Sequence, residues 1–162
     1  MTRLSGRHVI ARRIMHIQSV LFVGRRNAAR SVMAEICFNA VELPSWRAFS
    51  AGWQPVEKVD RHALHVLAEG GFPSDTVTPK PVDIFLQPGA PRVDLCIFLD
   101  KKLPANVAAY PGVREFWQIA DPSHGNSGPA AYRDTLMSIT GRLSELILSG
   151  RLAHPDGLPL AS

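Results

Sequence analysis

The seven residues IQSVLFV at 17–23 form an uncharged run that is rich in large apolar side chains. Such a run is typical of a strand buried on both faces, as strands inside a parallel sheet are. Gly24 and an arginine-rich turn follow it directly, and residues 30–43 then carry apolar side chains at helical spacing. We therefore predict a buried strand, a tight turn and a helix, which is the opening unit of an α/β fold.

The rest of the chain repeats this alternation of apolar runs and helical patterns. Asp60 is the predicted N-cap of a second helix, and the pair Gly70-Gly71 is its predicted end. We expect the proline-rich segment 72–91 to hold at most one helical turn. Further strands are predicted at 46–52, 92–100 and 113–120, a helix at 59–71, a short helix or loop at 101–110, and a last helix within 121–152 with Leu136, Ile139, Leu143 and Ile147 on one face. The predicted fold class is α/β, a four-stranded parallel open sheet with helices on both faces.

Composition describes an ordinary globular chain of 162 residues, with 46% apolar and 20% charged residues. We divide it into a basic N-terminal extension at 1–16, an α/β domain at 17–150 and a loose tail at 151–162. Either Met1 or Met15 fits as the start. Because no apolar run reaches the roughly 18 residues of a membrane span, we expect no membrane partner and a cytoplasmic location.

The two cysteines, Cys37 and Cys96, lie in apolar segments and have neither metal-binding nor redox spacing. We interpret both as core thiols of a protein from a reducing compartment. His62 and His65 are three residues apart on a predicted helix, but no third ligand accompanies them. We therefore expect neither a metal nor a cofactor.

Positive charge is concentrated at the amino end, which favours anionic partners. No aromatic-interleaved strand or recognition-helix pattern favours nucleic acid among them. Seven arginines precede the first acidic residue, Glu35: Arg3, Arg7, Arg12, Arg13, Arg25, Arg26 and Arg30.

The turn after the first strand has the composition of an anion cradle. A loop that opens a helix turns several amides toward one point, where the helix dipole adds to them. Gly24 permits close approach or a positive φ, Asn27 tolerates the left-handed conformation, and Ser31 is a candidate N-cap whose hydroxyl faces the loop. Arg30 is placed to fold back and hold two oxygens of a tetrahedral anion. The alternative is a plain strand-to-helix turn with solvated arginines, and the residues alone leave both open.

The segment VLFVGRRNAARSVMAE at 20–35 resembles the phosphate-binding signature of low-molecular-weight protein tyrosine phosphatases and the related thiol-dependent arsenate reductases. Further matches follow in the family's order: SAG at 50–52, an apolar strand ending in Asp100, and the pair Asp121-Pro122. The resemblance implies that Ser50 and Asn27 hold the loop's shape and that Asp121 is the general acid. It implies phosphate or arsenate binding by Arg25, Arg26, Asn27, Ala28, Ala29, Arg30 and Ser31.

One position departs from this pattern, because Gly24 occupies the place of the family's nucleophilic cysteine. Ser31 has no adjacent base, and Cys37 lies about two helical turns, roughly 10 Å, beyond Arg30. The expectation is therefore a phosphate or phospho-ligand binder without catalysis. Replacing a thiolate by glycine also removes negative charge beside the bound anion, which favours affinity.

Two more departures concern the substrate. The tyrosines that commonly follow Asp-Pro are replaced by Ser123 and His124, which puts specificity for phosphotyrosine in doubt. Trp53 or His124 is then a possible substrate wall, although packing is the commoner role of a lone tryptophan. No cysteine follows the third strand, so the disulfide relay of thioredoxin-coupled arsenate reductases is not expected.

Three functions remain from the sequence. The first is a catalytically inactive binder of phosphate, sulfate or a phosphorylated protein. The second is a phosphatase or arsenate reductase whose cysteine was removed from this version of the chain. The third is a protein–protein scaffold with a relic cradle. The sequence leaves the biological ligand and the oligomeric state open.

Overall fold

The computed structural model describes residues 17–110, 112–125 and 128–152. The predicted N-terminal extension and nearly all of the predicted tail lie outside the described residues. In chain order the elements are strand β1 (Gln18–Gly24), helix α2 (Arg30–Ala40), strand β2 (Trp46–Gly52), helix α3 (Arg61–Glu69), the 3-10 turn η1 (Val82–Phe85), strand β3 (Leu95–Phe98), helix α4 (Ala105–Ala108), strand β4 (Val113–Phe116) and helix α5 (Pro129–Leu148).

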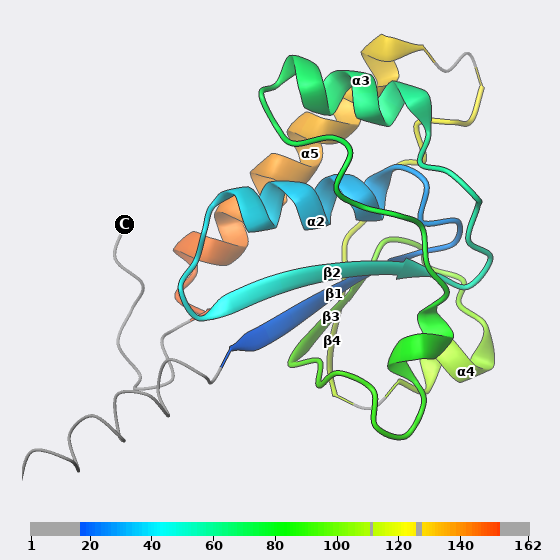
Figure 1. Cartoon of the computed structure of the whole chain (residues 1–162), viewed down its shortest axis with the longest axis vertical. Coiled ribbons are helices and arrows are strands. Elements are labelled where there is room, and N and C mark those ends of the chain that lie inside the picture. The colour runs from blue at the N-terminus through cyan, green and yellow to red at the C-terminus, as the bar shows by residue number, and fades with distance from the viewer. Residues whose placement is uncertain (1–16, 111, 126–127, 153–162) are drawn as a thin grey trace, which may run out of the picture.

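The four strands form one parallel sheet in the order β2-β1-β3-β4, which confirms the predicted fold class (Figure 1). β1 is central and pairs with β2 on one side and with β3 on the other. After β1 the chain builds β2 on one side and then returns to build β3 on the opposite side. In such sheets ligands bind beyond the carboxyl ends of the strands, at the point where the connections change sides. The turn after Gly24 lies at this point.

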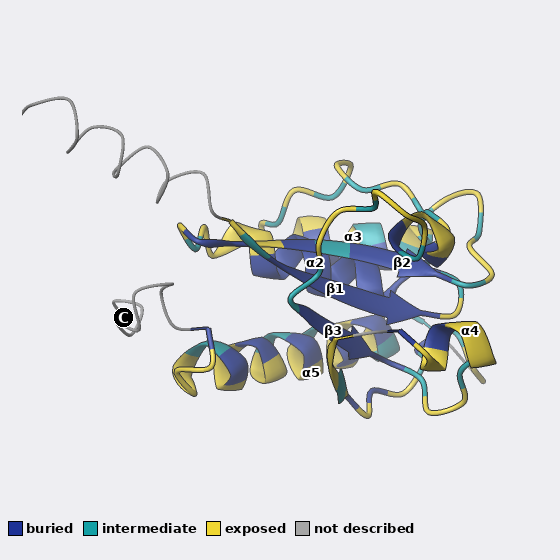
Figure 2. Ribbon diagram, turned by 90° about the horizontal axis from the view of Figure 1, so that it is seen from below, coloured by how far each residue is buried: buried dark blue, intermediate teal, exposed yellow. Residues whose placement is uncertain are grey.

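Two apolar clusters cover the two faces of the sheet. The larger one packs β1 against the three long helices, with Phe22, Met33 and Tyr132 among its fully buried side chains. The smaller one lies on the opposite face, where Phe85 of η1 and Val107 of α4 cover Val23. Figure 2 shows β1 and β3 as buried and α5 as exposed only on its outer side. Both faces of these central strands are therefore covered, as a parallel sheet requires.

The two edges of the sheet differ. The outer edge of β2 is closed by the amide of Asn39, which donates to the carbonyl of Ala48 (3.1 Å) and accepts from its N–H (2.8 Å). Farther along the same edge, the N–H of Gly52 donates to the carbonyl of Lys80 (3.0 Å). On β4, by contrast, the side chains of Val113 and Phe116 are 61% and 54% exposed.

Most element boundaries follow the sequence prediction, with β2 at the expected residues and Asp60 accepting a hydrogen bond from the N–H of His62 (3.0 Å) as the N-cap of α3. The prediction of Ser31 as an N-cap is wrong, because α2 already begins at Arg30 and Ala29 occupies the cap position.

β3 and β4 are shorter than predicted. The ladder ends at Leu99, whose N–H still donates to the carbonyl of Val23 (2.9 Å) but whose carbonyl accepts from the Arg30 side chain instead of a strand. Among the described helices, none has the length and apolar character needed to cross a membrane.

Candidate functional site

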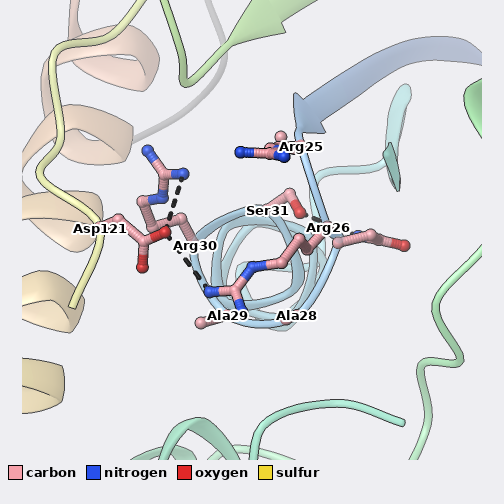
Figure 3. Close-up of a pocket in the computed structure, with 9 residues that line it drawn as sticks. Arg25, Arg26, Ala28, Ala29, Arg30, Ser31 and Asp121 are labelled. Atoms are coloured by element: carbon pink, nitrogen blue, oxygen red, sulfur yellow. Dashed lines mark hydrogen bonds and ion pairs between the residues drawn. The ribbon is translucent and has the colours of Figure 1, made fainter. Parts of the chain in front are cut away.

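Residues Gly24 to Ser31, together with Asp121, line a small hollow at the carboxyl end of β1 (Figure 3). Its volume is about 20 Å³, which is more than one water molecule needs. We call this hollow the cradle. It brings together eight consecutive residues of the predicted loop with an aspartate nearly a hundred positions away in the sequence.

The backbone of the loop is turned so that its carbonyls face outward. The carbonyls of Arg25, Arg26 and Ala28 accept hydrogen bonds of 2.8, 3.0 and 2.9 Å from the amides of Gln54, Val56 and Asp60, in that order. In a trans peptide the N–H points opposite to the preceding C=O, so the N–H groups of Arg26, Asn27 and Ala29 face the interior of the loop. Within the described part of the chain, the amides of residues 26–31 donate to no other group. An inward ring of unpaired donors beside a helix N-terminus is suited to binding an anion.

Two glycines contribute to this geometry in different ways. A Cβ on Gly52 would lie 2.6 Å from the carbonyl oxygen of Arg25 and 2.9 Å from the amide nitrogen of Asn27. Gly52 is therefore required for the close approach of β2 to the loop. Gly24 is not constrained in this way, because its φ is not positive and an added Cβ would lie 3.5 Å from Oγ of Ser31. Of the two roles that the sequence offered for Gly24, the positive φ does not occur, and there is no close approach that a Cβ would block.

Asn27 fixes the shape of the loop. Its φ is +51°, the left-handed conformation predicted for it, and its side chain is almost fully buried. Its side-chain Nδ2 donates to Oγ of Ser31 (2.8 Å) and to Oγ of Ser50 (3.0 Å). Its side-chain Oδ1 accepts from the backbone N–H of Lys80 (3.0 Å). One buried side chain thus connects the loop, the second strand and the segment that closes the edge of β2.

Arg30 folds back over the cradle and is anchored on the far side. Its Nη1 donates to the carbonyls of Leu99 (2.9 Å) and Ile119 (3.0 Å). Its Nη2 donates to both carboxylate oxygens of Asp100, at 3.0 and 3.3 Å. These bonds hold the guanidinium in place, and they leave its Nε–H, which donates to no other described group, as the donor available to an anion.

Asp121 lies at the mouth of the cradle between two arginines. Its Oδ2 is 3.4 Å from Nη2 of Arg26 and 3.8 Å from Nη2 of Arg30, and Figure 3 shows both guanidinium groups directed at it. Ser123 adds hydrogen bonds to Oδ1 from its N–H (2.9 Å) and its hydroxyl (2.7 Å). Burial raises the pKa of Asp121, but the bonds from Ser123 and the two arginines outweigh it, so the pKa is lowered overall. Asp121 is therefore a carboxylate at neutral pH.

Arg26 completes this contact by donating from Nη2 to Oγ of Ser123 (2.5 Å). Arg25, in contrast, leaves the cradle: its Nε donates to the side chain of Gln54 (2.8 Å), and in Figure 3 its guanidinium lies apart. The backbone N–H of Arg25 donates to Oδ2 of Asp100 (3.1 Å). Only two of the three loop arginines therefore contribute their side-chain charge to the mouth of the cradle.

The chain has no thiol near the cradle. Cys37 and Cys96 are both buried in the core, as predicted, and burial raises the pKa of each to about 12. Neither lines the cradle. Within the described residues, no group of three or more histidine, cysteine or acidic side chains is arranged to hold a metal ion.

The other residues singled out from the sequence lie at varying distances from the cradle. Ser50 lies behind the loop and acts on it through Asn27. Trp53 does not line the cradle and packs against the smaller apolar cluster. His124 is exposed, with Nε2 3.7 Å from Oδ2 of Asp121, and lines a neighbouring groove rather than the cradle.

Sequence reasoning did not assign site roles to Asp100, Lys80 or Ser123. Asp100 follows β3, which lies beside β1, so its carboxylate reaches Arg30 at the same end of the sheet. Its position directly after an apolar strand was the available signal, because carboxyl ends of parallel strands meet at one edge. Lys80 acts through its backbone, which no side-chain pattern reveals.

A family model described as "Low molecular weight phosphotyrosine protein phosphatase" matches residues 19–154, most of the chain. The chain belongs to this family. Among solved structures, an arsenate reductase from Archaeoglobus fulgidus is 34% identical to it, with a TM-score of 0.63 over 78% of this chain and 97% of the other. Among curated protein sequences there is no significant match.

Two more distant structures share the fold of the family. One is an arsenate reductase in its phosphate-binding state, 24% identical, with a TM-score of 0.68 over 82% of this chain and 98% of the other. The second is a low-molecular-weight protein tyrosine phosphatase from T. tengcongensis, 24% identical, with a TM-score of 0.61 over 82% and 99%. The predicted family is thus confirmed, and its structures include both reductases and phosphatases.

Proposed function

We propose that this chain binds phosphate or a related tetrahedral oxyanion in the cradle and does not turn it over. The observation that carries the proposal is the loop itself. Its inward amides and the free Nε–H of Arg30 are donors suited to a tetrahedral anion, while Gly24 at its floor carries no side chain.

Binding is supported by the charge and order of the cradle. Arg26 and Arg30 are within 4 Å of the mouth carboxylate, and Arg30 is already fixed by bonds to Leu99 and Ile119. A guanidinium held in advance loses little conformational entropy when it binds an anion. A thiolate at position 24 would repel a bound dianion by about 4 kcal/mol per unit-charge pair at 4 Å and an effective dielectric near 20. Gly24 contributes no such repulsion.

Loss of catalysis is supported by the absence of a nucleophile. Gly24 stands where the family resemblance places the attacking cysteine, and removing a covalent nucleophile typically costs on the order of 10⁶ in rate. Neither buried cysteine offers a replacement, because a thiol with a pKa of about 12 is almost fully protonated at neutral pH.

Calorimetric titration of the full chain with inorganic phosphate, sulfate and arsenate tests binding. We expect all three to bind, and Arg30→Ala to abolish the heat. Arg30→Lys, which keeps the charge but not the paired donors, is expected to weaken binding and covers the case in which the alanine variant is unstable. Arg47→Ala is the matched control, because Arg47 is exposed on β2 and lies outside the cradle. No heat with native protein would overturn the proposal.

Hydrolysis of p-nitrophenyl phosphate tests the second part of the proposal, that the chain does not turn over its ligand. We expect no turnover by the native chain, turnover by Gly24→Cys, and none by Gly24→Ala, which adds the same Cβ without the thiol. A Cβ at position 24 would meet Oγ of Ser31 at 3.5 Å, an ordinary contact distance. Turnover by the native chain would show that another group attacks, and the binder assignment would then be wrong.

A further inference from the structure

A larger groove of about 730 Å³ lies on the other side of Arg30 from the cradle. Phe116 lines it from the end of β4, Gln118 and Ala120 from the segment that follows, and Arg142 from α5. Arg30 and Asp121 line both the groove and the cradle. A ligand held in the cradle can therefore continue into this groove.

One wall of the groove is an open strand edge. The N–H of Trp117 donates to the carbonyl of Phe98 (2.9 Å) and the carbonyl of Ile119 accepts from Arg30, so both residues direct their backbone groups toward the sheet. In an extended chain successive residues direct these groups to opposite sides. The backbone groups of Gln118 and Ala120 therefore face outward, and they bond to nothing else within the described residues.

Side-chain burial follows the same alternation. Trp117 and Ile119 are buried, whereas Phe116, Gln118 and Ala120 are exposed. The residues from Phe116 to Ala120 thus prolong the edge of β4 toward Asp121. A strand advances about 3.3 Å per residue, so Asp121 follows Gln118 by about 10 Å along this edge.

The charge left free along the groove is positive. Asp100 and Asp121 are engaged by Arg30 and Arg26, whereas Lys101 forms no ion pair with a described residue. Arg142 has only a loose contact with Glu145, at 3.8 Å. The groove is therefore complementary to an acidic ligand.

We propose that an extended phosphorylated peptide docks in this groove as a fifth strand along Phe116–Ala120, with its phosphate in the cradle. The proposal rests on the anion binding proposed above. A strand added to an open edge gains affinity from main-chain hydrogen bonds, largely independent of its side chains. Acidic residues near the phosphorylated position would face Lys101 and Arg142. Neither a free anion nor a nucleic acid would pair with both the backbone N–H and the backbone carbonyl of Gln118, as a peptide strand does.

Fluorescence anisotropy with labelled synthetic peptides tests the docking. The probes are aspartate-rich peptides with a central phosphotyrosine or phosphoserine, each with its unphosphorylated form, and inorganic phosphate as competitor. We expect at least one phosphopeptide to bind about tenfold or more tightly than inorganic phosphate does. Methylation of every second backbone nitrogen on the pairing side of the peptide should remove this advantage, and methylation on the opposite side should not.

Protein variants give the matching result. Gln118→Pro removes the outward donor at a position where an edge strand tolerates proline, and Gln118→Ala keeps that donor. We expect the proline variant to bind the peptide no better than phosphate, with its affinity for inorganic phosphate unchanged, and the alanine variant to resemble the native chain.

The outcomes separate the two proposals. If inorganic phosphate does not bind, the proposed function fails. If phosphate binds but phosphopeptides bind no better, or both methylated peptides bind equally well, the docking surface is wrong. A native dimer in solution that Gln118→Pro dissociates would assign this edge to a second copy of the chain and also overturn it.

Discussion

Nη2 of Arg26 lies 3.4 Å from Oδ2 of Asp121, so a cation of the loop and a carboxylate of the facing segment meet across the mouth of the cradle. The same carboxylate lines the cradle and lies 3.8 Å from Nη2 of Arg30, so it repels an anion bound there. Asp121 therefore orients the two arginines and also repels a bound anion. These two effects act in opposite directions on the affinity for the anion, and the affinity shows which is larger.

We predict that Asp121→Asn raises the affinity for inorganic phosphate by about tenfold, because it removes a repelling charge while keeping a similar shape. Calorimetric titration at neutral pH measures the change. Asp75→Asn is the control, since it alters the net charge equally at an exposed position outside the cradle. A weaker affinity in Asp121→Asn would mean that orienting Arg26 matters more than repulsion.

The lowered pKa of Asp121 also predicts how stability depends on pH. A carboxyl whose folded pKa lies below its unfolded value of about 3.9 stabilises the fold above that value, and this contribution is lost as the pH falls through the folded pKa. We expect Asp121→Asn to be less stable than the native chain at pH 7, with the difference shrinking as the pH falls below about 4 and vanishing below the folded pKa. Urea unfolding at several pH values measures it. A difference that stays constant from pH 7 to pH 3 would contradict this account.

Gly52 and Gly24 lie next to the same loop, but an added Cβ would clash with the loop backbone only at Gly52. We predict that Gly52→Ala lowers the free energy of unfolding by about 1 to 3 kcal/mol and weakens phosphate binding, because the new methyl group would displace the loop at Arg25 and Asn27. Gly24→Ala should leave stability nearly unchanged, since its Cβ meets Ser31 at an ordinary contact distance. Thermal unfolding of both variants decides the point, and equal losses would show that the loop is not packed as described.

The buried cysteines predict the thiol chemistry of the folded chain. Because burial raises the pKa of Cys37 and Cys96 to about 12, iodoacetamide at pH 8 should leave the native protein unlabelled and modify both thiols once it is unfolded. Gly24→Cys should add one thiol that reacts in the folded state, where the helix dipole and Arg30 favour the thiolate. Mass spectrometry counts the modifications. Labelling of the native chain at either cysteine would contradict its burial.

The sequence predicted the fold and the position of the loop because both depend on local patterns. Apolar runs marked β1 and β2, and the composition of 24–31 marked the turn. Asn27 was also predictable, since a left-handed residue in a tight turn has few alternatives.

The partners of those residues were not predictable in the same way. The contact between Arg30 and Asp100 joins positions 70 residues apart, and it exists because β3 lies next to β1 in the sheet. Nothing local in the chain encodes that neighbour relation. The close backbone approach offered as a role for Gly24 belongs instead to Gly52. Only the strand register places Gly52 against the loop.

The side-chain amide of Asn39 binds both backbone groups of Ala48 and so blocks the outer edge of β2 against further strand pairing. If two copies of the chain paired through their β4 edges, the outer edges of the combined sheet would both be β2 edges. Edge-to-edge pairing of this sheet would therefore stop at two copies and would not extend into a fibre.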